Sequence, residues 1–74
     1  MQSVRQDLLK GFQNEIAQIF EMNQNYKGDD KLKIFKSPEY IVLSGVIKLT
    51  HPHAPDTEIL TYIISFHSQS LRNT

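Results

Sequence analysis

Cysteine is absent from this chain of 74 residues, and both glycine and long apolar runs are scarce. Without cysteine the chain has neither disulfides nor thiolate zinc sites. The three glycines are scattered, so no glycine-rich loop is available to hold a phosphate group. No segment approaches the run of about 20 apolar residues that a membrane span needs, and the N-terminus lacks a signal-peptide core. We therefore expect a soluble protein that does not act in a membrane, most simply a cytoplasmic one.

An excess of charge of one sign is also missing. Eight basic and eight acidic residues give a formal net charge of zero at pH 7, which argues against a protein whose main task is to neutralise nucleic-acid phosphates. The length predicts a single domain, residues 1–74, that buries only about 60 to 65% of its unfolded surface. Small domains often gain stability by oligomerisation, so an oligomer or a permanent partner is expected.

Residues 3–24 predict an amphipathic helix. Ser3 and Gln6 fit a capping box at its start, and Gly11 is a weak point that costs about 1 kcal/mol relative to alanine. The apolar residues that recur at helical spacing are Val4, Leu8, Leu9, Phe12, Ile16, Ile19 and Phe20.

Three later segments, at residues 31–37, 40–50 and 57–67, favour β-strands. Their apolar residues alternate and are rich in β-branched side chains. The first strand is expected to end at Ser37–Pro38, and the loop HPHAPD, residues 51–56, is expected to join the other two. The predicted fold class is therefore α+β, with one N-terminal helix packed on a three-stranded antiparallel sheet in the order α-β-β-β.

This fold predicts a core in which the helix stripe meets one face of the sheet. The helix would contribute Leu8, Phe12, Ile16, Ile19 and Phe20, and the strands would contribute Leu43, Ile47, Leu60, Ile64 and Phe66. Ile41 and Leu49 alternate in phase with Leu43 and Ile47, so the second strand assigns them to the same face.

The opposite face of the predicted sheet would have no helix to cover it. Its partner-binding candidates are Phe35, Tyr40, Val42, Val46, Ile59 and Ile63. Such an apolar patch with a polar rim is typical of a contact surface, and the simplest partner is a second copy of the chain. The alternative is an ordinary exposed sheet face, because isolated aliphatic residues are common on protein surfaces.

Residues that could carry chemistry are few. His51, His53 and Asp56 resemble part of a metal site, but two histidines flanking a proline are a weak signal, and His67 would lie at the far end of the hairpin. No Gly-x-Ser-x-Gly motif marks a nucleophile. We expect no catalytic residue, no metal and no cofactor.

A lysine-rich segment offers an alternative function, because lysines beside aromatic rings can form a groove for single-stranded nucleic acid. Its candidates are Tyr26, Lys27, Lys31, Lys33, Phe35 and Lys36. Asp29 and Asp30 offset part of this charge, and lysines on an edge strand also prevent aggregation. The main expectation is therefore a small non-enzymatic protein–protein interaction module, an accessory, regulatory or inhibitor protein that forms homodimers.

Overall fold

The computed structural model describes residues 6–72, and every regular element in that range is helical. A four-residue helix, α1, and a 3₁₀ turn, η1, precede the longer helix α2. A 3₁₀ helix, η2, then leads into α3, and a loop connects α3 to the longest helix, α4. The bounds are α1 Gln6–Leu9, η1 Lys10–Phe12, α2 Gln13–Asn25, η2 Gly28–Lys36, α3 Pro38–Ile47 and α4 Asp56–Arg72.

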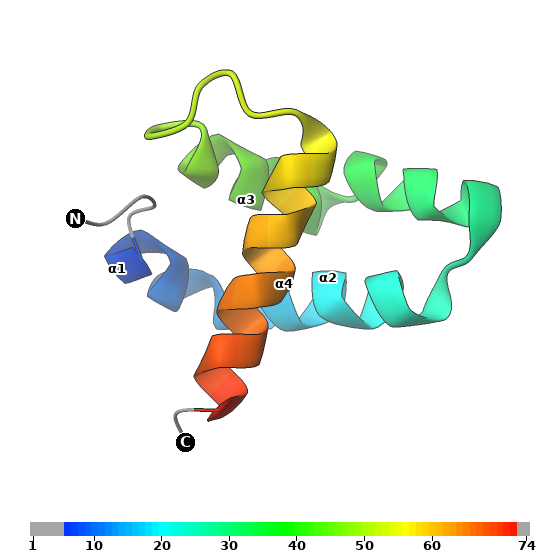
Figure 1. The fold of residues 1–74 in the computed structure, drawn as a ribbon, viewed down its shortest axis with the longest axis horizontal. Coiled ribbons are helices and arrows are strands. Elements are labelled where there is room, and N and C mark those ends of the chain that lie inside the picture. The colour runs from blue at the N-terminus through cyan, green and yellow to red at the C-terminus, as the bar shows by residue number, and fades with distance from the viewer. Residues whose placement is uncertain (1–5, 73–74) are drawn as a thin grey trace.

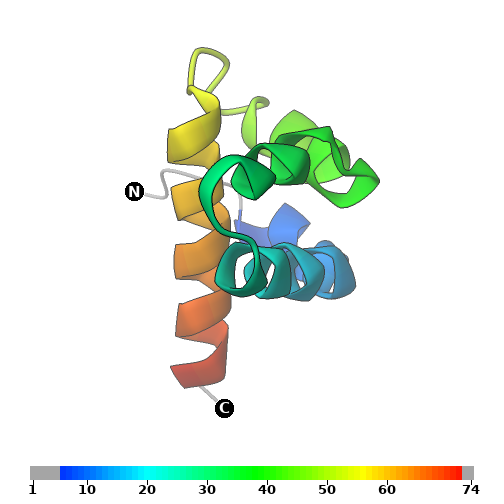
Figure 2. The same cartoon turned by 90° about the vertical axis from the view of Figure 1, so that its right-hand side faces the viewer.

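The helices form two layers. Helix α4 crosses steeply over α2 and the neighbouring η2–α3 segment (Figure 1), and the view turned by 90° shows α4 alone on one side. Figure 2 also shows η2 and α3 running above α1 and α2 within the other layer. This arrangement gives a flat molecule, 17 Å thick along its shortest axis.

The core lies where these layers meet. Helix α4 contributes Ile59 and Ile63, which are four residues apart and have no exposed surface. The other buried apolar residues are Leu9, Ile16, Ile19, Ile34, Tyr40, Leu43 and Ile47. Because the buried residues come from all the longer elements, no single helix can leave the bundle without exposing core surface.

Local signals explain where the helices begin. The hydroxyl of Ser37 accepts a hydrogen bond from the Tyr40 N–H (3.2 Å) and donates one to the Ile34 carbonyl (2.7 Å), so this side chain caps α3 and closes η2. Pro38 occupies the first turn of α3, where its missing N–H is harmless. Gly28 has a φ of +59°, a left-handed conformation that lets the chain turn out of α2.

The predicted α+β fold is wrong, because residues 6–72 contain no strand. Residues 31–36 of the expected first strand lie within η2, and Ser37 caps α3. The expected second strand forms α3 and the following turn, and the third lies within α4. The physical reason is that side chains along α3 and α4 also recur at helical spacing. Tyr40, Leu43 and Ile47 follow one helix stripe, and the tertiary packing that buries this stripe overrides the β preference of the branched residues.

The expected N-terminal helix is confirmed in its longer part. It is interrupted at Gly11, where the 3₁₀ turn η1 separates α1 from α2. Ser3 and Val4 lie outside the described residues. The predicted core is confirmed for Ile16, Ile19, Leu43 and Ile47, which are fully buried. Phe12, Phe20, Leu60, Ile64 and Phe66 are only partly buried, and Leu8 is 37% exposed.

Candidate protein-binding surface

Helix α3 is apolar on nearly all sides, although only one side of it is covered. Its sequence, PEYIVLSGVI, contains one charged residue, Glu39. Tyr40, Leu43 and Ile47 face the core, where α3 packs against α2, η2 and α4. A helix with apolar residues all round is normally buried on all sides. The uncovered side of α3 is therefore the feature of this molecule that most needs an explanation.

That uncovered side carries three large apolar residues. Ile41 is 59% exposed, Val42 is 44% exposed and Leu49 is 71% exposed. Leu49 lies two residues after the end of α3, in a turn that continues the helical path, because the Leu49 N–H donates to the Val46 carbonyl (3.2 Å). We call Ile41, Val42, Gly45 and Leu49 the α3 outer face.

Gly45 is an unexpected residue at the middle of this face. A methyl group placed on its Cα would meet no atom within 4 Å, and its φ is not positive. Glycine inside a helix costs about 1 kcal/mol relative to alanine. Gly11 and Gly28 are equally open, so the space at Gly45 is that of an exposed position, and nothing within the described fold requires glycine here.

The size of the α3 outer face is also informative. Its three large residues are 44% to 71% exposed, and the largest apolar patches of ordinary monomers are often functional. Lys48 is exposed beside the patch. A contiguous apolar centre with a charged residue at its edge is the usual anatomy of a contact surface.

The residues predicted to bind a partner do not form one surface. Ile59 and Ile63 are completely buried, and Tyr40 is 3% exposed. Phe35 and Val46 are partly buried and pack against the core. Among the six predicted residues, only Val42 is exposed. A surface formed from all six is therefore incompatible with this fold, because burial by the chain itself already occupies most of them.

Tyr40 has a structural role instead. Its hydroxyl donates a hydrogen bond to Oδ1 of Asp56 (2.7 Å), which joins the start of α3 to the start of α4. The ring contacts Phe35 edge-on, with 5.1 Å between the ring centroids. Burial raises the pKa of the Tyr40 hydroxyl well above its usual range, and the hydrogen bond and negative charge of Asp56 act in the same direction.

The lysine–aromatic segment is divided between core and solvent. Tyr26 and Phe35 are partly buried and pack against the core, so their faces are not open platforms for stacked bases. Nζ of Lys31 donates to the carbonyl (3.0 Å) and to Oδ1 (3.1 Å) of Asn23. Lys27, Lys33 and Lys36 are exposed, and Lys33 forms an ion pair with Asp30 (3.5 Å).

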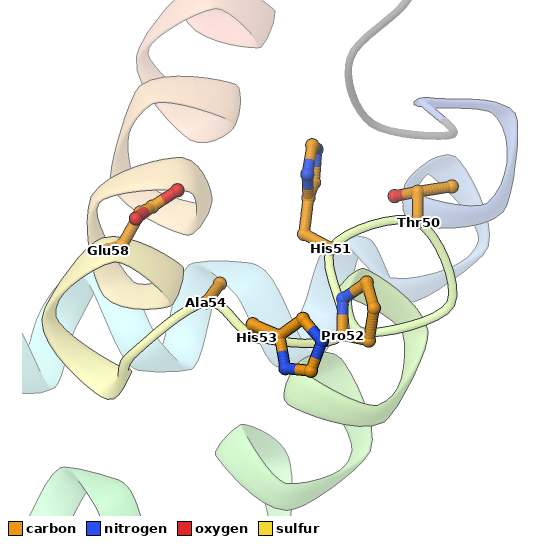
Figure 3. A pocket seen from close by; sticks show the side chains of 6 residues that line it. All are labelled: Thr50, His51, Pro52, His53, Ala54 and Glu58. Atoms are coloured by element: carbon orange, nitrogen blue, oxygen red, sulfur yellow. The ribbon is translucent and has the colours of Figure 1, made fainter.

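The loop between α3 and α4 forms an open hollow of about 310 Å³. Figure 3 shows the side chains that line it, with the His51 and His53 rings pointing in different directions and Glu58 approaching from α4. The His51 ring stacks on Tyr62, with 5.2 Å between the centroids. His67 is remote from this loop, because its ring contacts that of Phe20 in α2, with 4.4 Å between the ring centroids.

The loop histidines do not assemble a metal site with the acidic residues. Among the side chains that the structure describes, no three histidine or carboxylate groups lie together so that they could hold a metal ion. Asp56, the third candidate, instead accepts the hydrogen bond from Tyr40. The hollow is an open feature of the loop, lined by residues of the loop and by Glu58 of α4.

Ile41, Gly45 and Leu49 are the surface residues that the strand interpretation missed. Alternation placed Ile41 and Leu49 on the same face as Leu43 and Ile47, whereas the helix separates them from that buried pair. A search for helical spacing in residues 38–49 could have found the exposed set.

Over the described residues no helix has the length and apolar character to cross a bilayer. Comparison with protein-family models, with curated proteins and with solved structures found no significant match to this chain.

Proposed function

We propose that this chain is a small non-enzymatic protein-binding module whose contact surface is the α3 outer face. The observation that carries the proposal is an exposed apolar face centred on a glycine that the fold does not need. A partner that covered this face would remove Ile41, Val42 and Leu49 from water, and burial of apolar area is the main driving force of most protein association.

The surface differs from the sheet face expected from the sequence, because no sheet exists in the described residues. The general argument behind that expectation still supports the proposal. A short chain without disulfides has a marginal core, and a helix left apolar on its outer side gains stability when another chain covers it. The lysine–aromatic segment is not proposed as a second function, because its two aromatic rings pack against the core.

Photo-crosslinking from the surface itself tests this proposal. A photoreactive residue replacing Val42 should form covalent products with a partner protein in the native host. The same residue replacing Gln18, an exposed position on α2, serves as the control. The Val42 products should be suppressed by an excess of the unmodified chain but not by an excess of Ile41→Asp. If position 42 gave no more product than position 18, the α3 outer face would not be a binding surface.

A further inference from the structure

We infer that the occupant of the α3 outer face is a second copy of this chain, packed so that two α3 helices run antiparallel across Gly45. This inference rests on the proposed function and adds the identity and geometry of the partner. It uses three observations, which are the spacing of the face, the open space at Gly45 and the position of Lys48.

The spacing of the face is self-complementary. Ile41 lies four residues before Gly45 and Leu49 lies four residues after it, so both are about one helical turn away on the same side. A two-fold axis at Gly45 places Ile41 of one copy opposite Leu49 of the other, and the reverse contact follows by symmetry. Such an isologous contact is the commonest way in which soluble proteins form dimers.

The open space at Gly45 fits the centre of such a pair. Axes of packed helices lie about 8 to 10 Å apart, and the side chains at the crossing set the distance. With glycine on both helices, the crossing point offers no side chain, and no atom of the chain itself fills that space. The helices can therefore approach closely enough for Ile41 and Leu49 to make contact, which offsets the cost of a glycine within α3.

The charge beside the face favours the antiparallel direction. In a parallel pair, Lys48 of one copy would lie next to Lys48 of the other, and the like charges would repel. In the antiparallel pair the two lysines lie on opposite sides of the axis, about 9 Å apart along the helix direction at 1.5 Å per residue. Antiparallel packing also sets the helix dipoles in opposite directions.

The area indicates a reversible dimer. The interface would cover three large apolar residues on each copy, which are 44% to 71% exposed in the single chain. An interface built from so few large residues lies at the small end of the known range, below roughly 1,200 Å² in total, where transient complexes are found. The dimer should therefore form as protein concentration rises, and dissociate on dilution.

Sedimentation of the full chain over a wide concentration range tests for this dimer. We expect a reversible monomer–dimer equilibrium that Gly45→Glu and Leu49→Asp each shift at least tenfold towards monomer. Glutamate is a better helix former than glycine, so the first variant should keep its fold, and Leu49 lies beyond the last residue of α3. Ala17→Glu makes a similar change at an exposed position of α2 and should leave the equilibrium unchanged.

Crosslinking then tests the direction of the helices. Because the sequence contains no cysteine, only the introduced cysteines can react. When Ile41→Cys and Leu49→Cys chains are mixed and treated with a short bis-maleimide, the mixed 41–49 product should exceed both homodimeric products. Predominant 41–41 and 49–49 products would overturn the antiparallel arrangement. A chain that stays monomeric at all concentrations would overturn self-association, whereas crosslinks from position 42 to another protein would still support the proposed function.

Discussion

Tyr40 is the residue that most directly connects two helices. Its hydroxyl is hydrogen-bonded to the Asp56 carboxylate, and its ring is buried between the starts of α3 and α4. Burial and the neighbouring negative charge both disfavour the phenolate, so the pKa of Tyr40 is raised in the folded state. The folded chain therefore retains this proton at a pH where the unfolded chain has lost it.

This shift makes the stability sensitive to alkaline pH. A raised folded-state pKa contributes stability that is fully present below the unfolded pKa, which is about 10 for tyrosine, and that is lost as pH rises above it. We predict that urea midpoints of the parent fall between pH 9 and pH 11, and that Tyr40→Phe shows a smaller fall. At pH 7 the same variant should lose about 1 kcal/mol, because its hydrogen bond is missing. Identical pH slopes for the two proteins would contradict the burial of the Tyr40 hydroxyl.

Ile63 distinguishes the predicted sheet from the helical fold. The predicted sheet places Ile63 on an exposed face, whereas the helical fold buries it completely. Ile63→Ala should destabilise the protein by about 2 to 5 kcal/mol, through lost burial and the cavity that remains. Ser65→Ala is a suitable control, since Ser65 lies on the exposed side of α4. Urea unfolding followed by circular dichroism measures both variants. An effect for Ile63→Ala as small as that of the control would place Ile63 on the surface.

At the scale of the element, the start of α3 depends on one hydroxyl group. Ser37 caps α3 through the Tyr40 N–H and also closes η2 through the Ile34 carbonyl, and its side chain is buried. Ser37→Ala should therefore cost about 1 to 2 kcal/mol of unfolding free energy. Ser68→Ala, an exposed change in α4, should cost far less. Denaturant unfolding compares them, and equal stabilities would mean that the cap contributes nothing.

The elements also show which parts of the fold the sequence could predict. The spacing of Phe12, Ile16 and Ile19 favours a helix, because the polar run at residues 13–15 is incompatible with strand alternation, and the structure confirms α2. Residues 38–47 are almost uniformly apolar, so alternation and helical spacing fit equally well, and β-branched residues favoured the wrong choice. The Ser37–Pro38 pair was interpreted as a strand end, although serine followed by proline is also a common helix start.

The 3₁₀ helix η2 could not have been predicted in the same way. It runs for nine residues, Gly28–Lys36, whereas 3₁₀ runs longer than three or four residues are uncommon. Its buried residue, Ile34, packs within the core, and the Ile34 carbonyl accepts a hydrogen bond from the Ser37 hydroxyl. Tertiary packing therefore determines this element, and no local pattern in the sequence specifies it.

At the scale of the whole molecule, the candidate surface follows from an imbalance between core and helix. Helix α3 has more apolar residues than this small bundle can enclose, so Ile41 and Leu49 remain exposed. The short length predicts an oligomer or a partner, and strand alternation placed the uncovered apolar surface on a sheet face. That location is wrong, because residues 38–47 form a helix and not a strand. Only the helical fold places Gly45 on an exposed face between Ile41 and Leu49.

The distribution of charge over the molecule leads to the last prediction, which concerns nucleic acid. Net charge is zero, and two lysines of the lysine–aromatic segment already have partners, Lys31 with Asn23 and Lys33 with Asp30. Few cations remain to displace counterions from a phosphate backbone, so binding of labelled single-stranded oligonucleotides should be weak at physiological salt. Fluorescence anisotropy measures this affinity.

A pair of variants makes this measurement decisive. Asp30→Asn removes the acidic partner of Lys33, so any electrostatic binding should increase, and Lys36→Glu should decrease it. If η2 is not a nucleic-acid surface, both variants should remain as weak as the parent, with little dependence on salt. Micromolar affinity in the parent that falls steeply with added salt and is lost in Lys36→Glu would instead show that η2 binds nucleic acid. In that case the partly buried rings of Tyr26 and Phe35 would have to reorient to contact the bases.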